Sequence, residues 1–296
     1  MEVSSTRPPA PPPAEFTASG LDSLPPLDMA RRAEQVGVAK ASLGAEKLLA
    51  LGVLAGAFIA MGAVFATTVT AGGSDLAYGV GRLLAGLAFS LGLILVVVAG
   101  AELFTGNNLV VMAWASGRVA TRRLLWTWTL VYLGNFAGAI ATAGLMYATR
   151  QYRFGGGVVG EQVLTIAAAK TGLGFVQAIA LGAFCNALVC LAVWLTYSAR
   201  TTADKILAII PPITAFVASG FEHSVANMYF IPIGLLVRHD SSWVASASAL
   251  PDLSSLSWGA FFVDNLLPVT IGNLIGGTVM VAALYWFVYL RSAPEG

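Results

Sequence analysis

An acid and an imidazole stand side by side in the segment GFEHSVAN, residues 220–227. No other charged residue occurs between Lys205 and Arg238, so Glu222 and His223 interrupt a long apolar stretch. A carboxyl inside a membrane costs roughly 2.5–3.5 kcal/mol on insertion scales and usually faces an interior cavity or a partner. A histidine changes its protonation state near neutral pH and can lend a proton to a weak acid in transit. The pair marks a candidate functional site, against the alternative of a buried neutral imidazole bonded to a nearby hydroxyl.

The composition places these residues in a membrane protein. Of the 296 residues, 57% are hydrophobic and 10% are charged, whereas soluble domains have about 25% charged residues. Six stretches are at least as long as the roughly 17–25 residues that cross a bilayer as a helix, and they lack the alternation of a barrel strand. They are Leu48–Ser74, Leu83–Ala101, Leu124–Thr149, Thr171–Ala199, Ile206–Val237 and Asn265–Leu290. We predict an all-α integral membrane protein with six transmembrane helices.

The two halves of the chain resemble each other in three blocks. VAKASLGAEKLLALGVLAGA aligns with AAKTGLGFVQAIALGAFCNA at an offset of 130 residues, VAGAELFTGNN with VASGFEHSVAN at 119, and GNFAGA with GNLIGG at 138. The blocks occur in the same order, one in each predicted span. Because each half has three spans, an odd number, the second half must enter the membrane from the opposite side. The sequence therefore predicts a 3+3 inverted repeat with its site between the halves.

The repeat explains the acid beside the imidazole. The second and fifth spans each have one acid, Glu102 or Glu222, flanked by glycine and small hydroxyl residues. This composition predicts that both helices are broken near the middle of the membrane. A break frees backbone N–H groups, and we expect the two carboxylates to accept hydrogen bonds from them, in preference to contacting a substrate directly. Thr105, at the break in the second span, offers a hydrogen-bond partner for His223.

Other polar residues accompany these breaks. Lys170 begins the fourth span, where it either snorkels to water or forms a fixed positive charge that draws anions inward; Lys40 is its counterpart in the first half. Asn135 and Asn273 lie in GNxxG patterns, which are typical of close helix packing with hydrogen bonds between helices. Asn186 is a further amide within a span.

The ends of the chain are polar. We expect a disordered Pro-rich tail at residues 1–27, a short amphipathic helix at 28–41, the six-helix domain at 42–292 and a short C-terminus at 293–296. Arginine and lysine are more frequent in the loops on the side of the termini, so both termini are predicted to be cytoplasmic. The sequence has no metal-ligand spacing, P-loop, nucleotide fingerprint or nucleophile elbow, so we expect no cofactor, no metal and no enzyme. The net charge of +1 gives no argument for nucleic acid.

The motifs GAELFTGNN, AKTGLG…CNALVCLAVWLTYSAR, ASGFEHSVANMYFIP and PVTIGNLIGG together resemble the formate/nitrite transporter family, with the formate channel branch most similar. The resemblance runs from about Glu34 to Arg291. It implies an aquaporin-like fold, a homopentamer with one pore in each protomer, and a location among the lipids of the bacterial inner membrane. It also implies passage of small monovalent anions such as formate, nitrite or hydrosulfide, coupled to protons.

The same resemblance assigns roles to individual residues. His223 matches the central pore histidine, Thr105 its hydrogen-bonding partner, Asn186 an asparagine near the pore and Lys170 the lysine that attracts anions, while Glu222 and Asn273 surround the break. Leu103 and Phe216 match an inner constriction, and the outer constriction is matched by Phe89, Leu93, Phe104 and Val189.

Three rival functions remain at this stage. A family member could be selective for nitrite or hydrosulfide. A neutral-solute pore of the aquaporin type would also have an inverted repeat, but it gives no reason for Lys170 and His223, and the paired NPA motifs are absent. An intramembrane enzyme using Glu222 and His223 as a base would normally add a nucleophile or metal ligands.

Overall fold

A computed structural model describes residues 23–73, 76–244, 247 and 250–291, and in these residues every regular element is a helix. The predicted tail lies mostly outside this range, as does the predicted C-terminus. The first helix, α1 (Pro26–Ser42), begins two residues before the amphipathic helix expected from the sequence and has proline at its first position. Its buried residues Met29, Ala30, Ala33, Gly37 and Ala41 recur at the three- and four-residue spacing of one helix face.

Five helices of the described chain are long and apolar enough to cross a membrane. They are α2 (Ala45–Thr70), α3 (Tyr78–Ala99), α5 (Thr121–Ala148), α7 (Phe175–Ser198) and the continuous helix Trp258–Tyr289, which comprises α11 (Trp258–Ala260), Phe261–Leu266, α12 (Leu267–Leu274), Ile275–Ala283 and α13 (Leu284–Tyr289). The remaining predicted span is divided between two shorter helices, α8 (Thr202–Ala218) and α9 (Ser224–Arg238).

The second and fifth helices are interrupted, as expected from the sequence. α3 ends at Ala99, and the chain becomes helical again at Gly106–Val110 and α4 (Val111–Ala115). α8 ends at Ala218, and α9 begins at Ser224. Each break has a glycine with a positive φ angle, +81° at Gly100 and +76° at Gly220, a conformation that other residues rarely adopt. The chain therefore turns away from the helix axis at equivalent places in the two halves.

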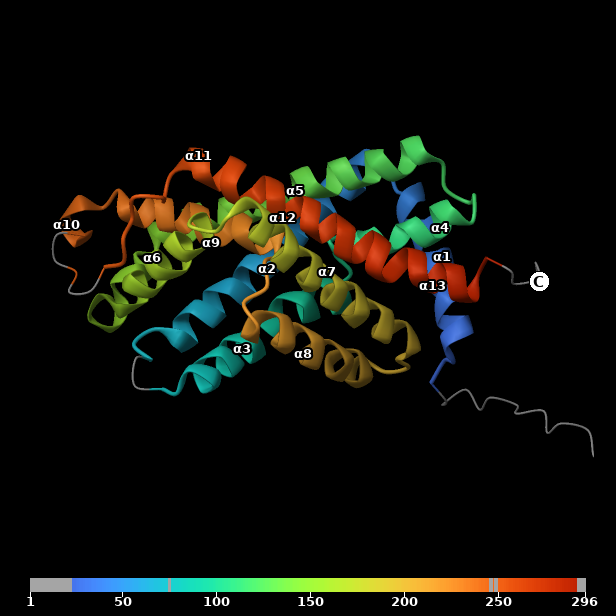
Figure 1. Cartoon of the computed structure of the whole chain (residues 1–296), viewed down its shortest axis with the longest axis horizontal. Coiled ribbons are helices and arrows are strands. Elements are labelled where there is room, and N and C mark those ends of the chain that lie inside the picture. Colours follow the sequence, from blue (N-terminus) through green and yellow to red (C-terminus); the bar gives the residue numbers. More distant parts are fainter. Residues whose placement is uncertain (1–22, 74–75, 245–246, 248–249, 292–296) are drawn as a thin grey trace, which may run out of the picture.

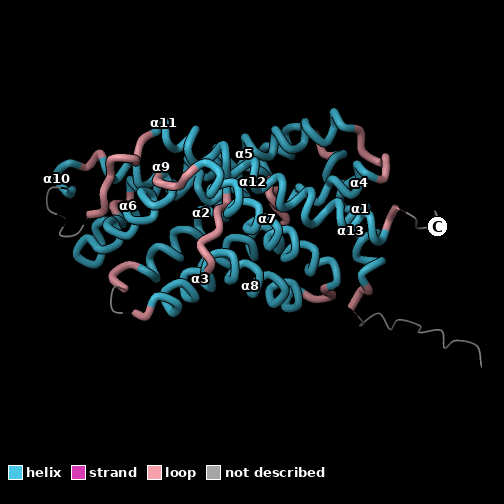
Figure 2. Tube along the Cα trace, viewed as in Figure 1, coloured by secondary structure: helices cyan, strands magenta, loops and turns pink. Residues whose placement is uncertain are grey.

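The helices form one elongated bundle (Figure 1). α1, α4 and α13 lie at one end, so both ends of the described chain are on the same side. α6 (Val158–Thr171) and α10 (Ser241–Val244) lie at the opposite end, near the short turn Gln151–Gly157. Figure 2 shows that the segment joining α8 to α9 runs through the middle of the molecule, away from both ends. The fold thus places the fifth-helix break deep inside the bundle.

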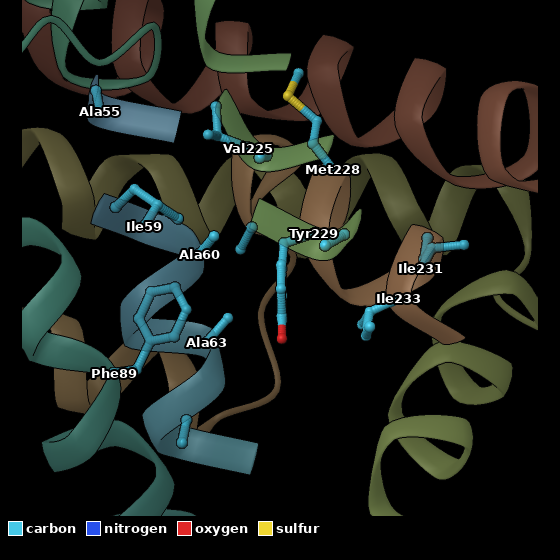
Figure 3. Close-up of a cluster of buried hydrophobic side chains, with 14 of the residues drawn as sticks. Ala55, Ile59, Ala60, Ala63, Phe89, Val225, Met228, Tyr229, Ile231 and Ile233 are labelled. Atoms are coloured by element: carbon cyan, nitrogen blue, oxygen red, sulfur yellow. The ribbon is translucent and has the colours of Figure 1, made fainter. Parts of the chain in front are cut away.

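Glycines allow the helices to approach closely. A Cβ atom at Gly56 of α2 would overlap the backbone of Asn135 in α5, and a Cβ at Gly276 would overlap the backbone of Ala183 in α7. The GNxxG motifs therefore mark close helix packing, as predicted. Around these contacts the core is apolar: Val225, Met228 and Tyr229 of α9 lie beside Ile59 and Ala60 of α2 (Figure 3).

Asp240 joins two loops at the end that contains α6. Its carboxylate accepts hydrogen bonds from Ser242 (2.7 Å), from Tyr152 (2.5 Å) and from the Arg153 guanidinium. These three bonds hold the pKa of the Asp240 carboxyl well below its usual range. The indole of Trp243 packs edge-to-face on the Tyr152 ring, with the ring centroids 5.7 Å apart. The cluster fixes the loop after α9 against the turn that precedes α6.

Candidate pore site

The two helix breaks meet at one hydrogen bond. Thr105 Oγ1 lies 2.9 Å from His223 Nε2, and both residues are buried. His223 is also the N-cap of α9, because its Nδ1 accepts the Ala226 N–H at 3.0 Å. A neutral imidazole has one donor and one acceptor nitrogen. Since Nδ1 accepts, the neutral ring has its proton on Nε2 and donates it to the Thr105 hydroxyl.

An ion pair stands beside the fifth-helix break. Lys170, near the end of α6, donates to Glu222 Oε1 at 2.8 Å, and its ammonium lies 5.4 Å from the centre of the Phe230 ring. The other carboxylate oxygen accepts from Asn227 at 2.7 Å and from Asn265 at 3.4 Å. Glu222 is buried, and Lys170 supplies the opposite charge beside it while the two amides add hydrogen bonds.

The second-helix break has a matching ion pair. Lys40, near the end of α1, donates to both oxygens of Glu102 at 2.8 and 2.9 Å and to Asn107 Oδ1 at 3.0 Å. Asn107 in turn donates to Glu102 at 2.7 Å. The two ion pairs differ in one respect: the Lys40 ammonium has three hydrogen bonds within the described protein, whereas that of Lys170 has one.

Asparagine side chains hold the broken backbone. Asn135 Oδ1 accepts the Phe104 N–H at 2.9 Å, and its Nδ2 donates to the carbonyls of Gly52 (2.8 Å) and Glu102 (2.9 Å). The expectation that Glu102 and Glu222 accept the freed backbone N–H groups is therefore wrong. Their side-chain oxygens instead face the lysines, which bind a carboxylate more strongly than a neutral amide N–H does.

Asn273 makes the same three bonds at the other break. It accepts the Ser224 N–H at 2.9 Å and donates to the carbonyls of Gly182 (2.8 Å) and Glu222 (2.9 Å). Residues that make the same contact at the two breaks differ in number by 120, for example Phe104 and Ser224. The alignment of identical residues in the sequence gives an offset of 119. At the offset of 120, Glu102 corresponds to Glu222 and Asn107 to Asn227, so the pattern Glu-x4-Asn is the signal from which Asn107 and Asn227 could have been found.

Two hollows lie on either side of these contacts. The hollow around Lys170, here called the Lys170 hollow, has a volume of about 790 Å³ and is lined by Lys170, Glu222, His223, Phe89 and Phe216, among others. The hollow around Lys40, the Lys40 hollow, has a volume of about 310 Å³, and its lining includes Lys40, Glu102, Leu93, Leu103 and Asn107. Each hollow thus contains one lysine and one acid from the matching ion pairs.

The residues predicted to form the two constrictions are distributed over both hollows and the core around them. Phe216, expected beside Leu103, lines the Lys170 hollow, with its ring 5.6 Å from Phe89 and 6.0 Å from the His223 ring. Leu103 and Leu93 line the Lys40 hollow. Phe104 packs edge-to-face on Tyr132, with the ring centroids 4.8 Å apart, and lines neither hollow.

The last two predicted residues lie behind the site. Val189 is buried in the apolar core and lines neither hollow. Asn186 donates to Asn108 Oδ1 (2.8 Å) and to the carbonyl oxygens of Asn273 (2.7 Å) and Thr105 (3.3 Å). Asn186 therefore links the backbone of the second-helix break, at Thr105, to α12, whose Asn273 holds the fifth-helix break.

Comparison with known proteins identifies the family. The sequence profile described as "Formate/nitrite transporter" matches residues 27–287. The chain belongs to the formate/nitrite transporter family. Its resemblance to that family, first inferred from four motifs, is confirmed, and the five apolar helices fit a membrane protein of this family.

Relatives within the formate/nitrite transporter family are similar over nearly the whole chain. The formate channel FocA of Escherichia coli (strain K12) is 45% identical over 273 residues, which cover 91% of this chain and 96% of that protein. FocA of Haemophilus influenzae is 38% identical over 262 residues, covering 88% and 92%. A solved structure described as a pentameric formate channel with formate bound has a TM-score of 0.78 at 45% identity, covering 83% of this chain and 98% of that one. These relatives are channels, which points to transport and away from catalysis.

Proposed function

We propose that this protein is a channel for small monovalent weak-acid anions, with formate as its main substrate. We also propose that it assembles as a homopentamer in the bacterial inner membrane with both termini in the cytoplasm. The names of the relatives and the pentameric structural neighbour support the substrate and the assembly. The position of α1 and α13 at the same end of the bundle supports a common side for the termini.

The observation that carries the proposal is the bond between Thr105 and His223. It joins the two breaks at a buried point, and His223 also lines the Lys170 hollow. A titratable ring is thus held where the two halves of the molecule meet. An apolar pore for water or glycerol would need neither this ring nor the two lysine–glutamate pairs.

Desolvation explains why a proton is needed. A bare anion passing Phe89 and Phe216 loses its hydration shell in apolar surroundings, at a cost of several kcal/mol, whereas the neutral acid does not. The same loss of water raises the affinity of the anion for a proton. Lys170, whose ammonium has one hydrogen bond to Glu222, retains N–H groups that can contact the anion before it reaches this ring pair.

His223 and Thr105 then provide the hydrogen-bond donors that the anion meets at the breaks. In its neutral form the ring donates Nε2–H to the Thr105 hydroxyl, which leaves the hydroxyl proton available for donation to a carboxylate oxygen of the anion. Charging the ring would place a second proton on Nδ1, where it would face the Ala226 N–H at 3.0 Å. We propose that His223, or water that it orders, delivers a proton to the anion, and that the charged ring forms only when Nδ1 leaves the Ala226 N–H.

We further propose that the fold is an aquaporin-like 3+3 inverted repeat. The support is the agreement of contacts between the halves: Asn135 and Asn273 make the same three bonds, and Lys40–Glu102 parallels Lys170–Glu222. In addition, the hydroxyls of Tyr132 and Thr270, which are equivalent at an offset of 138, hydrogen-bond to each other at 2.9 Å. Such a contact between equivalent positions is expected close to a twofold axis.

The experiment is a comparison of solutes in proteoliposomes containing the pentamer. We expect rapid formate uptake that increases as the external pH falls, because more of the permeant is then paired with a proton. Nitrite and hydrosulfide are measured in parallel, and faster flux of either one would assign the protein to that branch of the family. Glycerol flux without any anion flux would refute the proposal.

A further inference from the structure

The long-range charge of Lys170 is largely cancelled by its partner. Its ammonium lies 2.8 Å from Glu222 Oε1, and both side chains are mostly buried. At distances much greater than this separation, such a pair acts as a dipole and attracts an approaching anion only weakly. Lys170 can contact an anion that has arrived, but another group must concentrate anions in the Lys170 hollow.

Arg82 is a second cation on the same hollow. It lies near the start of α3, and its side chain is part-buried. None of the ion pairs of the described chain includes Arg82. The other acid on this hollow, Glu161 of α6, is engaged in an interaction of its own. Arg82 thus retains a full positive charge that no carboxylate of the described residues neutralises at short range.

The guanidinium is fixed at the fifth-helix break. Its Nε donates to the carbonyl of Ala218 at 3.0 Å, and its Nη2 donates to the carbonyl of Val217. These are the last carbonyls of α8, whose end has a partial negative charge of about half an elementary charge, so a net positive charge remains. A Cβ atom at Gly220 would lie 3.2 Å from Nη2, so the absence of a side chain there leaves room for the guanidinium.

The geometry leaves part of the guanidinium available. Arginine has five N–H donors in a planar arrangement, and the two carbonyl bonds use only some of them. Arg82 lines the same hollow as Glu222 and His223, and the carbonyls that hold its guanidinium precede these two residues by a few positions in the chain. A localised charge in a concave, low-dielectric site raises the local concentration of ions of opposite sign.

We propose that Arg82 is the residue that concentrates anions in the Lys170 hollow, ahead of their contact with Lys170 and His223. The inference rests on the proposed anion channel function. The Lys40 hollow provides a matched control, because Lys205 of α8 lines it and also has no ion pair within the described chain.

The test uses the pentamer in planar bilayers with formate added on one side at a time. At low ionic strength, Arg82→Gln should lower formate flux from the Lys170 side about tenfold at limiting formate. At 1 M ionic strength, where the screening length is about 3 Å, the difference should nearly vanish. Arg82→Lys should keep most of the flux and its salt dependence. Lys205→Gln should leave capture from the Lys170 side unchanged.

A second variant separates charge from helix capping. Ala85 lines the same hollow one helical turn from Arg82, so Ala85→Glu adds a neutralising charge without removing the two carbonyl bonds. We expect the same salt-dependent loss of flux as for Arg82→Gln, including in the case that Arg82→Gln does not assemble. Unchanged flux in Ala85→Glu, or a loss that is equal at low and high salt, would overturn the role of Arg82. Absence of anion flux in the wild-type pentamer would overturn the channel function itself, and this inference with it.

Discussion

Replacing Asn273 by alanine should destabilise the fold more than most single substitutions. The side chain is fully buried and makes three hydrogen bonds of 2.8–2.9 Å, to Ser224, Gly182 and Glu222. Asn273→Ala leaves the Ser224 N–H and the Glu222 carbonyl without this partner in the interior, whereas the Gly182 carbonyl keeps its hydrogen bond within α7. At about 1–3 kcal/mol for each of the two unsatisfied groups, the loss amounts to about 2–6 kcal/mol. At about 2–4 °C per kcal/mol, the melting temperature should fall by about 4–24 °C.

The assay is thermal melting of the detergent-solubilised pentamer, with two matched variants. Asn135→Ala removes the three equivalent bonds at the other break and should cost a similar amount. Thr278→Val lies on the same long helix as Asn273 and removes only one local bond, from its hydroxyl to the Leu274 carbonyl, so it should cost less than about 1 kcal/mol. If Asn273→Ala melted like Thr278→Val, the idea that this amide holds the fifth-helix break would be refuted.

Three further predictions follow from other contacts. Glu222→Gln leaves the Lys170 charge without a carboxylate and should destabilise the pentamer by about 3–5 kcal/mol, while the double variant Glu222→Gln, Lys170→Gln should recover part of this loss; equal melting of the single and double variants would contradict it. Gly56→Val should prevent assembly on size-exclusion chromatography, because its side chain meets the backbone of α5, whereas Gly79→Ala, with open space around it, should assemble normally. Because the pKa of Asp240 is lowered in the folded protein, its carboxylate contributes fully to the stability of this loop contact above about pH 4. This contribution to stability is lost as the pH falls below that value. Amide exchange of residues 151–157, corrected for its intrinsic pH dependence, should therefore increase in acid in the wild type but show no such acid-dependent step in Asp240→Asn.

The sequence predicted the parts of the fold that depend on composition. Long apolar stretches predicted the spanning helices, and glycines beside an isolated acid predicted both breaks. The hydrogen bond between Thr105 and His223 was also predicted, because Thr105 supplies a hydroxyl at the second-helix break and His223 an imidazole at the fifth-helix break.

The partners of the two acids could not be predicted in the same way. Either a lysine or a free backbone N–H could have bound Glu102 and Glu222, and only the path of α1 and α6 brings Lys40 and Lys170 within reach. The asparagines then became the ligands of the broken backbone. That Leu103 and Phe216 share a constriction stays a prediction: the two residues line different hollows, and sequence distance does not reveal on which side of the breaks a residue lies.

The most direct test of the central claim measures protons and formate together in His223→Asn. In wild-type proteoliposomes, formate uptake should be accompanied by proton uptake and should rise as the external pH falls. Asparagine cannot exchange a proton near neutral pH, so the variant should lose proton-coupled uptake and retain at most an electrogenic formate leak. Unchanged proton uptake for each formate in assembled His223→Asn pentamers would contradict the proposed role of His223.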